Sequence, residues 1–209
     1  MISYRSEGTE SLNARLLLCL LLVTGLVLSV GAQERIKVDS TTPTGKIIMM
    51  DPKLVDASAL PLTSVESLHS TGTPQSVDLS SWRLAVSGKG VTSPLSLTYD
   101  ELSRFPTVKK RVLLICPGLF YDYLEWEGVP LQALLEKAGV RDYTHGVFAS
   151  VDGYKADFTK AEVQTGLIMV ALRDNGVPLP RAHGFPARIV AEGVYGGRWV
   201  KYLTSIALE

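Results

Sequence analysis

Hydrophobic residues occur along this chain in short runs, which predicts many short strands and a few short helices. Residues 112–115 are apolar and partly β-branched, and residues 167–172 are an unbroken apolar run, so both favour buried strands. Residues 147–151 and 154–158 flank an Asp-Gly pair at 152–153, the strongest hairpin signal in the chain. The pattern therefore predicts a β-rich fold of the α+β class.

The helices that the pattern predicts are short. Apolar side chains at 131, 134, 135 and 138 fall on one helical face, and Gly139 is placed as a C-terminal cap. Thr98 and Thr159 each precede a glutamate by three residues, which is the spacing of a capping box. We expect a helix to begin at each of these threonines.

The first 32 residues have the pattern of a secretory signal. Arg5 and Arg15 precede an apolar run at 16–32 that ends in small residues, so we expect cleavage after Ala32. An uncleaved membrane anchor is the alternative, because a spanning helix needs at least roughly 17 apolar residues. Both interpretations place the rest of the chain in the periplasm or another extracytoplasmic compartment.

The chain after this signal divides into two parts. Residues 33–77 are rich in Ser, Thr and Pro without a sustained period, which predicts a tether or loosely packed lead-in, with one strand expected at 46–50. His69 lies in this part and is interpreted as an isolated polar loop residue. The domain proper is expected over residues 78–209.

Composition indicates a globular body without a preferred charged partner. The chain is 46% hydrophobic, and 21 Lys and Arg balance 21 Asp and Glu. The overall charge gives no electrostatic reason to expect nucleic acid or an anionic membrane surface as partner. Binding of an anion must therefore depend on a local cluster of cations.

Cys116 stands at the end of an apolar strand, where Pro117 and Gly118 break the pattern. Cys19 lies within the expected signal, so the exported chain keeps Cys116 alone and cannot form an internal disulfide. A lone cysteine is most often a small buried hydrophobic residue. A thiolate at a strand end also suits a soft metal ligand or a nucleophile.

A second informative stretch lies near the C-terminus. His183, Arg188, Arg198 and Lys201 occur among several glycines. Charge-assisted bonds combined with a concave backbone are typical of phosphate binding, whereas the alternative is a solvated basic strand edge. The sequence has no Walker-type or dinucleotide glycine motif that would decide between them.

Several motifs in a fixed order carry a resemblance to a known family. They run from about residue 82 to residue 209: Val86-Ser-Gly88, Pro94-Leu-Ser-Leu97, Asp100-Glu-Leu102, Cys116, Trp126-x-Gly128-x-x-Leu131, Leu134-Leu135, Asp152-Gly153-Tyr154, Asn175-Gly176-x-Pro-Leu179, His183-Gly-x-Pro186-x-Arg188, Tyr195-Gly196 and Val200-Lys201. In these motifs the chain resembles the molybdopterin-binding domain of the sulfite oxidase family, which includes the bacterial periplasmic methionine sulfoxide reductase catalytic subunit. The resemblance implies a mixed β-rich sulfite-oxidase-type fold.

The resemblance also implies a cofactor, molybdenum-molybdopterin, and residues that hold it. Cys116 is similar to the thiolate that binds molybdenum, while the other sulfur ligands come from the pterin dithiolene. His183, Arg188 and Lys201 match positions that hold the pterin and its phosphate, and Ser150 matches a hydroxyl residue that contacts the cofactor. Because it lies close to Lys201, Arg198 is expected to add a bidentate phosphate contact.

The chain departs from the family pattern in its N-terminal part. No Arg-Asn-His motif or equivalent asparagine occurs between Gln33 and Ser81, although the family uses such a motif to hold the pterin. The dimerisation domain and the haem domain of true sulfite oxidases are not found. We therefore expect a minimal, stand-alone version of the domain.

These features predict an exported oxidoreductase that transfers an oxygen atom to or from a small sulfur-containing or similar substrate. The sequence has no Cys-x-x-Cys-His haem motif, so a separate cytochrome or quinone-linked membrane subunit is expected as electron partner. The alternative function is a non-catalytic exported module that binds another anionic ligand. Thiol redox chemistry is disfavoured because Cys116 has no resolving cysteine.

Overall fold

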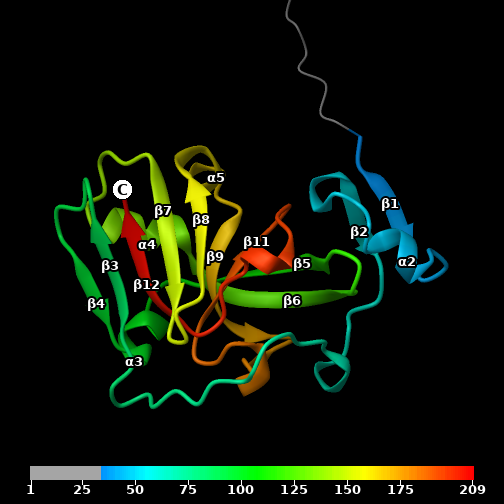
Figure 1. Ribbon diagram of the computed structural model, residues 1–209, viewed down its shortest axis with the longest axis horizontal. Helices are drawn as coiled ribbons and strands as arrows, with labels where there is room; N and C mark the ends of the chain where they lie inside the picture. The colour runs from blue at the N-terminus through cyan, green and yellow to red at the C-terminus, as the bar shows by residue number, and fades with distance from the viewer. Residues whose placement is uncertain (1–33) are drawn as a thin grey trace, which may run out of the picture. The chain divides into compact units, whose positions relative to one another are not determined.

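Two sheets of five strands each form the framework of the described chain (Figure 1). The structure is a computed structural model that describes residues 34–209, so the signal or anchor expected at 1–32 lies outside the described residues. Strands outnumber helices, and the helices are short. The predicted β-rich fold of the α+β class is therefore confirmed.

The first sheet is antiparallel and contains the strand that ends in Cys116. Its strand order is β10-β9-β6-β5, and β11 also pairs with β9. Its strands are β5 (Val108–Cys116), β6 (Phe120–Pro130), β9 (Ile168–Asp174), β10 (Val177–Pro178) and β11 (Arg188–Ala191). The two buried strands predicted from apolar runs are confirmed as parts of β5 and β9.

The second sheet has the order β4-β3-β12-β7-β8. Its strands are β3 (Leu84–Gly88), β4 (Leu95–Leu97), β7 (His145–Ser150), β8 (Lys155–Thr159) and β12 (Leu203–Leu208). The C-terminal strand β12 lies between β3, to which it is parallel, and β7, to which it is antiparallel. Gly153 closes the predicted β7–β8 hairpin with a φ of +87°, which glycine adopts without a steric penalty.

Two of the short helices begin where the capping-box signals predicted. Both capping boxes are formed, with Thr98 bonded to Glu101 and Thr159 bonded to Glu162. The helices are α2 (Thr44–Ile47), α3 (Tyr99–Ser103), α4 (Leu131–Lys137) and α5 (Lys160–Gln164). The 3-10 helices are η1 (Pro52–Leu54), η2 (Val65–Ser67), η3 (Arg181–His183) and η4 (Gly196–Arg198).

The main hydrophobic core joins residues of both sheets with the apolar face of α4. Leu131, Leu134 and Leu135 are buried in it, as the helical spacing predicted. Trp126 and Trp199 meet edge to face, with ring centroids 5.9 Å apart. Because aromatic side chains bury a large area in a fixed geometry, this pair holds β6 against the segment that follows η4.

The N-terminal lead-in is more ordered than the sequence predicted. Strand β1 (Ile36–Asp39) runs parallel to β2 (Val55–Ala59), and a second core forms where this segment packs on the first sheet. That core contains Val38, Ile47, Val55, Ala57 and Leu60 with Leu113, Ile115 and Tyr123. The strand predicted at 46–50 is wrong, because α2 occupies 44–47 and buries Ile47. The apolar face of the β5–β6 hairpin selects this packing, and no periodicity in the lead-in signals it.

Residues 68–81 form no helix or strand and run beneath the two sheets in the view of Figure 1. The C-terminal end of this segment is held by the next residue, Trp82, which is buried and whose indole nitrogen donates to the carbonyl of Leu203 at 3.1 Å. Within residues 34–209, no helix has the length and apolar character needed to cross a membrane.

Candidate functional site

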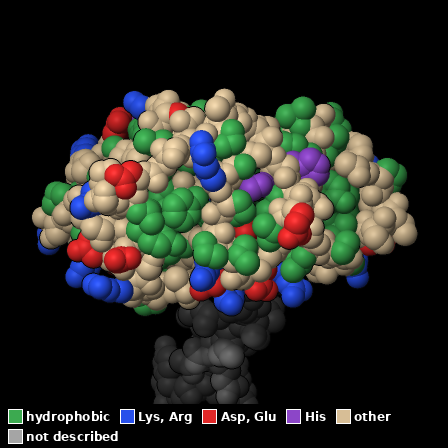
Figure 2. All heavy atoms as spheres, turned by 90° about the horizontal axis from the view of Figure 1, so that it is seen from below, with side chains coloured by type: hydrophobic (Ala, Val, Ile, Leu, Met, Phe, Trp, Pro, Cys, Tyr) green, Lys and Arg blue, Asp and Glu red, His purple; other side chains and the backbone are tan. Residues whose placement is uncertain are grey.

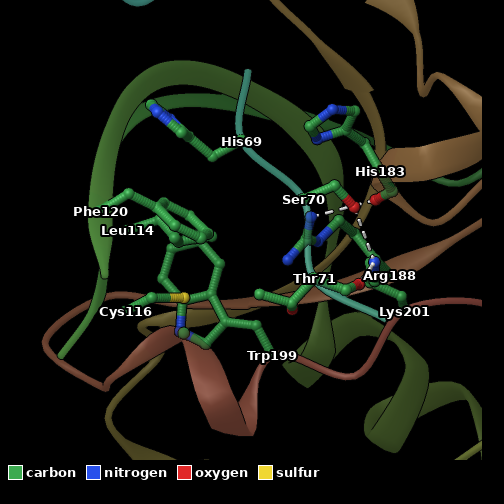
Figure 3. Close-up of a pocket in the computed structure, with 11 residues that line it drawn as sticks. His69, Ser70, Thr71, Leu114, Cys116, Phe120, His183, Arg188, Trp199 and Lys201 are labelled. Carbon is green, nitrogen blue, oxygen red and sulfur yellow. Dashed lines mark hydrogen bonds between the residues drawn. The ribbon is translucent and has the colours of Figure 1, made fainter. Parts of the chain in front are cut away.

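Cys116 lies in a pocket built from segments far apart in the sequence (Figure 3). The lining residues of this Cys116 pocket are His69, Ser70, Thr71, Leu114, Cys116, Phe120, His183, Arg188, Gly196, Trp199 and Lys201. Four residues that the sequence singled out, Cys116, His183, Arg188 and Lys201, are therefore brought together. β5, η3, β11 and the segment before β12 each contribute one of them.

A second hollow adjoins the Cys116 pocket and reaches Ser150. This Ser150 pocket has a volume of about 260 Å³ and shares Thr71, Gly196, Trp199 and Lys201 with the first. Ser150 is buried at the end of β7, beside the β7–β8 turn. The two hollows together can hold an elongated ligand that extends from the thiol of Cys116 to the hydroxyl of Ser150.

The β5–β6 turn fixes the position of Cys116. Gly118 has a φ of +73°, and the amide of Leu119 donates to the carbonyl of Cys116 at 3.0 Å, which closes the hairpin directly after the cysteine. The sulfur faces Gly196, where an added Cβ would lie 3.1 Å from Sγ. Glycine at position 196 thus keeps space free beside the thiol.

The Cys116 thiol is not activated by its surroundings alone. It is partly exposed, and its pKa is raised chiefly by burial, while the charges of Arg188 and Lys201 act in the opposite direction. A thiol with a raised pKa is a poor nucleophile at neutral pH. A bound soft metal would instead replace the proton and stabilise the thiolate.

Arg188 is a buried cation beneath the pocket. Its side chain lies over the rings of Trp126 and Trp199, at 5.0 and 5.9 Å, and donates to the carbonyl of His183 at 3.0 Å. Burial lowers its pKa to about 10, although Asp174 counteracts this, so the guanidinium stays charged at neutral pH. Its Nε has no hydrogen-bond partner among the described residues. A polar ligand would satisfy this donor, which is costly to leave buried and unpaired.

His183 is buried in η3 and is uncharged at neutral pH. Burial lowers its pKa to about 4, and the positive charges of Arg188 and Lys201 contribute in the same direction. A neutral imidazole offers one donor and one acceptor instead of a charge. His183 is therefore suited to orient a heterocyclic ligand and not to neutralise a phosphate.

Lys201 connects the pocket to the segment 70–71. Its Nζ donates to Ser70 Oγ at 3.1 Å, to the Thr71 carbonyl at 2.6 Å and to the Ala182 carbonyl at 3.0 Å. Burial lowers the pKa of Lys201, and the charge of Arg188 lowers it further. Lys201 thus holds one side of the pocket in place and brings a positive charge to the boundary between the two hollows.

Arg198 does not reach the Cys116 pocket. Its guanidinium donates to the Glu162 carboxylate at 2.7 and 3.1 Å and lies over the Phe158 ring at 4.3 Å. This contact lowers the pKa of Glu162 to about 2. The bidentate contact predicted with a phosphate is thus made with a side chain of α5. Proximity to Lys201 in sequence was misleading, because η4 turns the Arg198 side chain toward α5.

His69 is a pocket residue that the sequence did not reveal, so its interpretation as an isolated loop residue is wrong. Its Nδ1 lies 2.9 Å from Asp122 Oδ1, and its backbone amide donates to Asp122 Oδ2 at 3.1 Å. The imidazole stacks on Phe120 with ring centroids 4.7 Å apart. The one available signal was Asp122, a lone carboxylate between two tyrosines in the strand after Cys116.

The donor set fits a metal held mainly by a cofactor. Within residues 34–209, no group of three or more His, Cys, Asp or Glu side chains is arranged to hold a metal ion. Cys116 is thus a single soft ligand, and a metal bound there needs further ligands from a cofactor. The free Nε of Arg188, the neutral His183 and the two adjoining hollows offer that cofactor polar contacts along its length.

Comparison with known proteins agrees with this arrangement. The family model of the oxidoreductase molybdopterin binding domain matches residues 70–209. Mitochondrial sulfite oxidase of Rattus norvegicus is 30% identical over 163 residues, which cover 64% of this chain and 30% of that protein. The uncharacterized oxidoreductase YuiH of Bacillus subtilis is 28% identical over 146 residues, which cover 69% of this chain and 73% of that protein.

The fold is shared with the sulfane dehydrogenase SoxCD of Paracoccus pantotrophus. The TM-score is 0.66 at 21% identity, over 99% of this chain and 56% of that chain. The chain spans about 30% of the length of the rat sulfite oxidase. Because the family model covers all of the second sheet and the whole Cys116 pocket except His69, the chain belongs to the oxidoreductase molybdopterin-binding domain family, whose members bind a molybdopterin cofactor.

Proposed function

We propose that the chain is an exported molybdenum-cofactor oxidoreductase that transfers an oxygen atom to or from a small sulfur-containing substrate. The observation that carries the proposal is the convergence of the Cys116 thiol, the buried Arg188 cation and the neutral His183 on one pocket. The relatives named sulfite oxidase and sulfane dehydrogenase support a sulfur substrate.

The residues of the pocket would each make a different contact with the cofactor. When bound, the cofactor supplies a metal that exchanges an oxygen atom and two electrons with the substrate. Cys116 would contribute one thiolate ligand, and Leu114 and Trp199 line the same pocket with apolar surface. Arg188 and Lys201 stabilise anionic groups of the cofactor, while His183 and Ser150 orient it through hydrogen bonds.

Turnover also requires a separate electron carrier. The sequence contains no Cys-x-x-Cys-His motif for a covalently attached haem. A periplasmic cytochrome or a quinone-linked membrane subunit is the proposed partner.

Export is proposed from the pattern of residues 1–32, with Gln33 as the first residue of the mature chain. Mass spectrometry of the N-terminus of the exported protein tests this. A membrane fraction that retains intact Met1 would instead support the anchored alternative.

The decisive experiment measures cofactor and activity together in protein from a host that makes the cofactor. We expect the wild type to contain molybdenum and pterin and to act on sulfite or on a sulfoxide. Cys116→Ser should fold and lose activity, because a hydroxyl replaces the soft ligand at similar volume. Full activity in Cys116→Ser would exclude the metal-ligand role. Absence of molybdenum from the wild type would favour the non-catalytic binding module.

A further inference from the structure

The Cys116 pocket is lined by a histidine that pairs with a buried carboxylate behind it, and neither residue has an assigned role. His69 lines this pocket, and its side chain is 54% exposed, whereas Asp122 on β6 is 2% exposed. The His69 ring lies over Phe120 on the side of the pocket where Cys116 lies (Figure 3). In the surface view from below, histidine side chains reach the surface beside a basic side chain and hydrophobic patches (Figure 2).

Asp122 controls the orientation of His69 through two contacts. It accepts from the His69 backbone amide at 3.1 Å and pairs with Nδ1 at 2.9 Å, so both the main chain and the ring are fixed. The stack on Phe120, with an interplanar angle of 13°, fixes the plane of the ring. A histidine held by three contacts, but still half exposed, is placed for chemistry more than for packing.

The pairing also selects the tautomer. An ionised carboxylate only accepts hydrogen bonds, so Nδ1 of His69 carries the proton toward Asp122. None of the hydrogen bonds among the described residues involves Nε2 of His69, so this atom remains available as a proton acceptor. Burial raises the pKa of Asp122, but its two hydrogen bonds with His69 act against this and favour the carboxylate.

Oxygen-atom transfer creates a need for such a group. Oxidation of a sulfur substrate forms one S–O bond, breaks both O–H bonds of a water molecule and releases two protons and two electrons. Reduction of a sulfoxide is the reverse reaction and consumes the same protons and electrons. The electrons pass to or from the separate electron carrier, so the protons require their own route between pocket and solvent.

We propose that His69, oriented by Asp122, is a catalytic residue whose Nε2 exchanges protons with the water that the reaction consumes or releases. This inference rests on the proposed function. The other pocket residues are less suited to the role. Arg188 stays charged and His183 stays neutral at neutral pH, and all three hydrogen bonds of the Lys201 ammonium go to protein oxygens.

The charged and titratable groups around His69 are few. Asp122 on β6 contacts it directly, and Cys116 on β5, Arg188 on β11, His183 in η3 and Lys201 share the pocket with it. The cations would repel a second positive charge on His69, whereas Asp122 stabilises it. Asp122 is therefore the one group of this set whose charge favours a proton on the His69 ring.

The test compares holoenzymes of the wild type, His69→Gln, His69→Gly and the control His145→Gln. His145 is also a partly exposed histidine with an acidic partner, Glu209 at 3.3 Å, but it lies at the start of β7. We expect His69→Gln to lower kcat by about a hundredfold or more and to remove one limb of the pH profile. KM and pterin content should not change, and imidazole in the buffer should restore turnover to His69→Gly.

A second measurement does not depend on turnover. The chain has three histidines, so the imidazole nitrogen signals of His69 can be assigned as those that His69→Gln removes from the nitrogen-15 spectrum. The expected form is the Nδ1–H tautomer, and Asp122→Asn should shift it toward the Nε2–H form. Finding the Nε2–H tautomer in the wild type would overturn the proposal.

The kinetic outcomes separate this inference from the proposed function. An active wild type with unchanged kcat and pH profile in His69→Gln would overturn the role of His69 alone. A fall in kcat that imidazole does not restore, together with a raised KM, would make His69 a substrate-positioning residue and also overturn proton transfer. A cofactor-loaded wild type that acts on neither sulfite nor a sulfoxide would overturn the proposed function, and the role of His69 with it.

Discussion

Arg188 is a charged side chain that is almost completely buried, so its position is energetically costly. It is 4% exposed, and Asp174 near it is fully buried with both carboxylate oxygens unpartnered among the described residues. Burial raises the pKa of Asp174 to about 6, despite the attraction of Arg188. A fold that keeps such a pair beneath a pocket carries an energetic cost, which polar groups of a ligand at Arg188 Nε would reduce.

Lys201 and Arg198 provide a direct test of the cation assignments. Lys201→Ala removes the positive charge between the two hollows and the bonds that hold the segment 70–71 in place, so cofactor affinity should fall roughly tenfold to a hundredfold, which corresponds to about 1.5–3 kcal/mol. Arg198→Ala should keep its pterin and lose at most about 1 kcal/mol of folding stability, because its bond to Glu162 is partly exposed. Pterin content after purification, with Lys137→Ala as surface control, decides between them. An equal loss of pterin from Lys201→Ala and Arg198→Ala would show that Arg198 also binds the cofactor.

His183 should make the folding stability depend on acid. Its pKa is about 4 in the folded protein against 6.5 ordinarily, so the unfolded chain binds a proton first as the pH falls through this window. Stability is therefore lost as the pH is lowered, by roughly 2 kcal/mol more in the wild type than in His183→Gln between about pH 7 and pH 5.

Urea unfolding of the two cofactor-free proteins measures this difference. The raised pKa of Asp174 acts in the opposite direction, because its folded form gains the proton first, but it is present in both proteins. If the free energy of unfolding fell equally with pH in the wild type and in His183→Gln, His183 would not be held neutral by burial.

At the scale of elements, the β5–β6 hairpin organises the site. It presents Cys116 at the end of one strand, and Phe120 and Asp122 at the start of the next. Three residues separate the metal-ligand candidate from the residue on which His69 stacks. η4 then approaches the end of β5 from the other side, and Gly196 is the point of contact.

Gly196→Ala should displace the Cys116 sulfur without unfolding the protein. The new Cβ would lie 3.1 Å from Cys116 Sγ and 3.1 Å from Leu114 side-chain atoms, which requires both to shift. Overpacking of this kind costs about 1–3 kcal/mol. Gly197→Ala is the matched control, since its Cβ would meet no atom within 4 Å.

Molybdenum content and thermal unfolding of the two purified variants are the measurements. We expect less molybdenum in Gly196→Ala than in Gly197→Ala, with both proteins folded. The same metal content in the two variants would show that the sulfur can move without losing the metal.

At the scale of the described chain, a second core attaches the N-terminal lead-in to the first sheet. Ile47 is fully buried in it, whereas Met49 is 71% exposed. Ile47→Ala should therefore lower the free energy of unfolding by about 3 kcal/mol, and Met49→Ala by less than about 0.5 kcal/mol. Chemical denaturation measures both values. A loosely packed tether would show no effect from either change.

The sequence by itself determined the local elements. The strand before Cys116, the hairpin at Gly153 and the capping boxes at Thr98 and Thr159 each depend on residues a few positions apart. The ordered motifs added the family and, with it, Cys116, His183, Arg188 and Lys201. These four do converge on one pocket, because their positions are set by the fold that the motifs identify.

Only the tertiary structure decided which residues meet across long distances in the chain. His69 and Asp122 are 53 positions apart, and Ile47 packs on a strand more than sixty positions further on. The prediction that Arg198 lies in the pocket did not hold for the same reason, because its partner Glu162 is 36 positions away in the sequence. Local sequence patterns report periodicity and turn chemistry, whereas burial and charge pairing depend on what the folded chain places opposite each side chain.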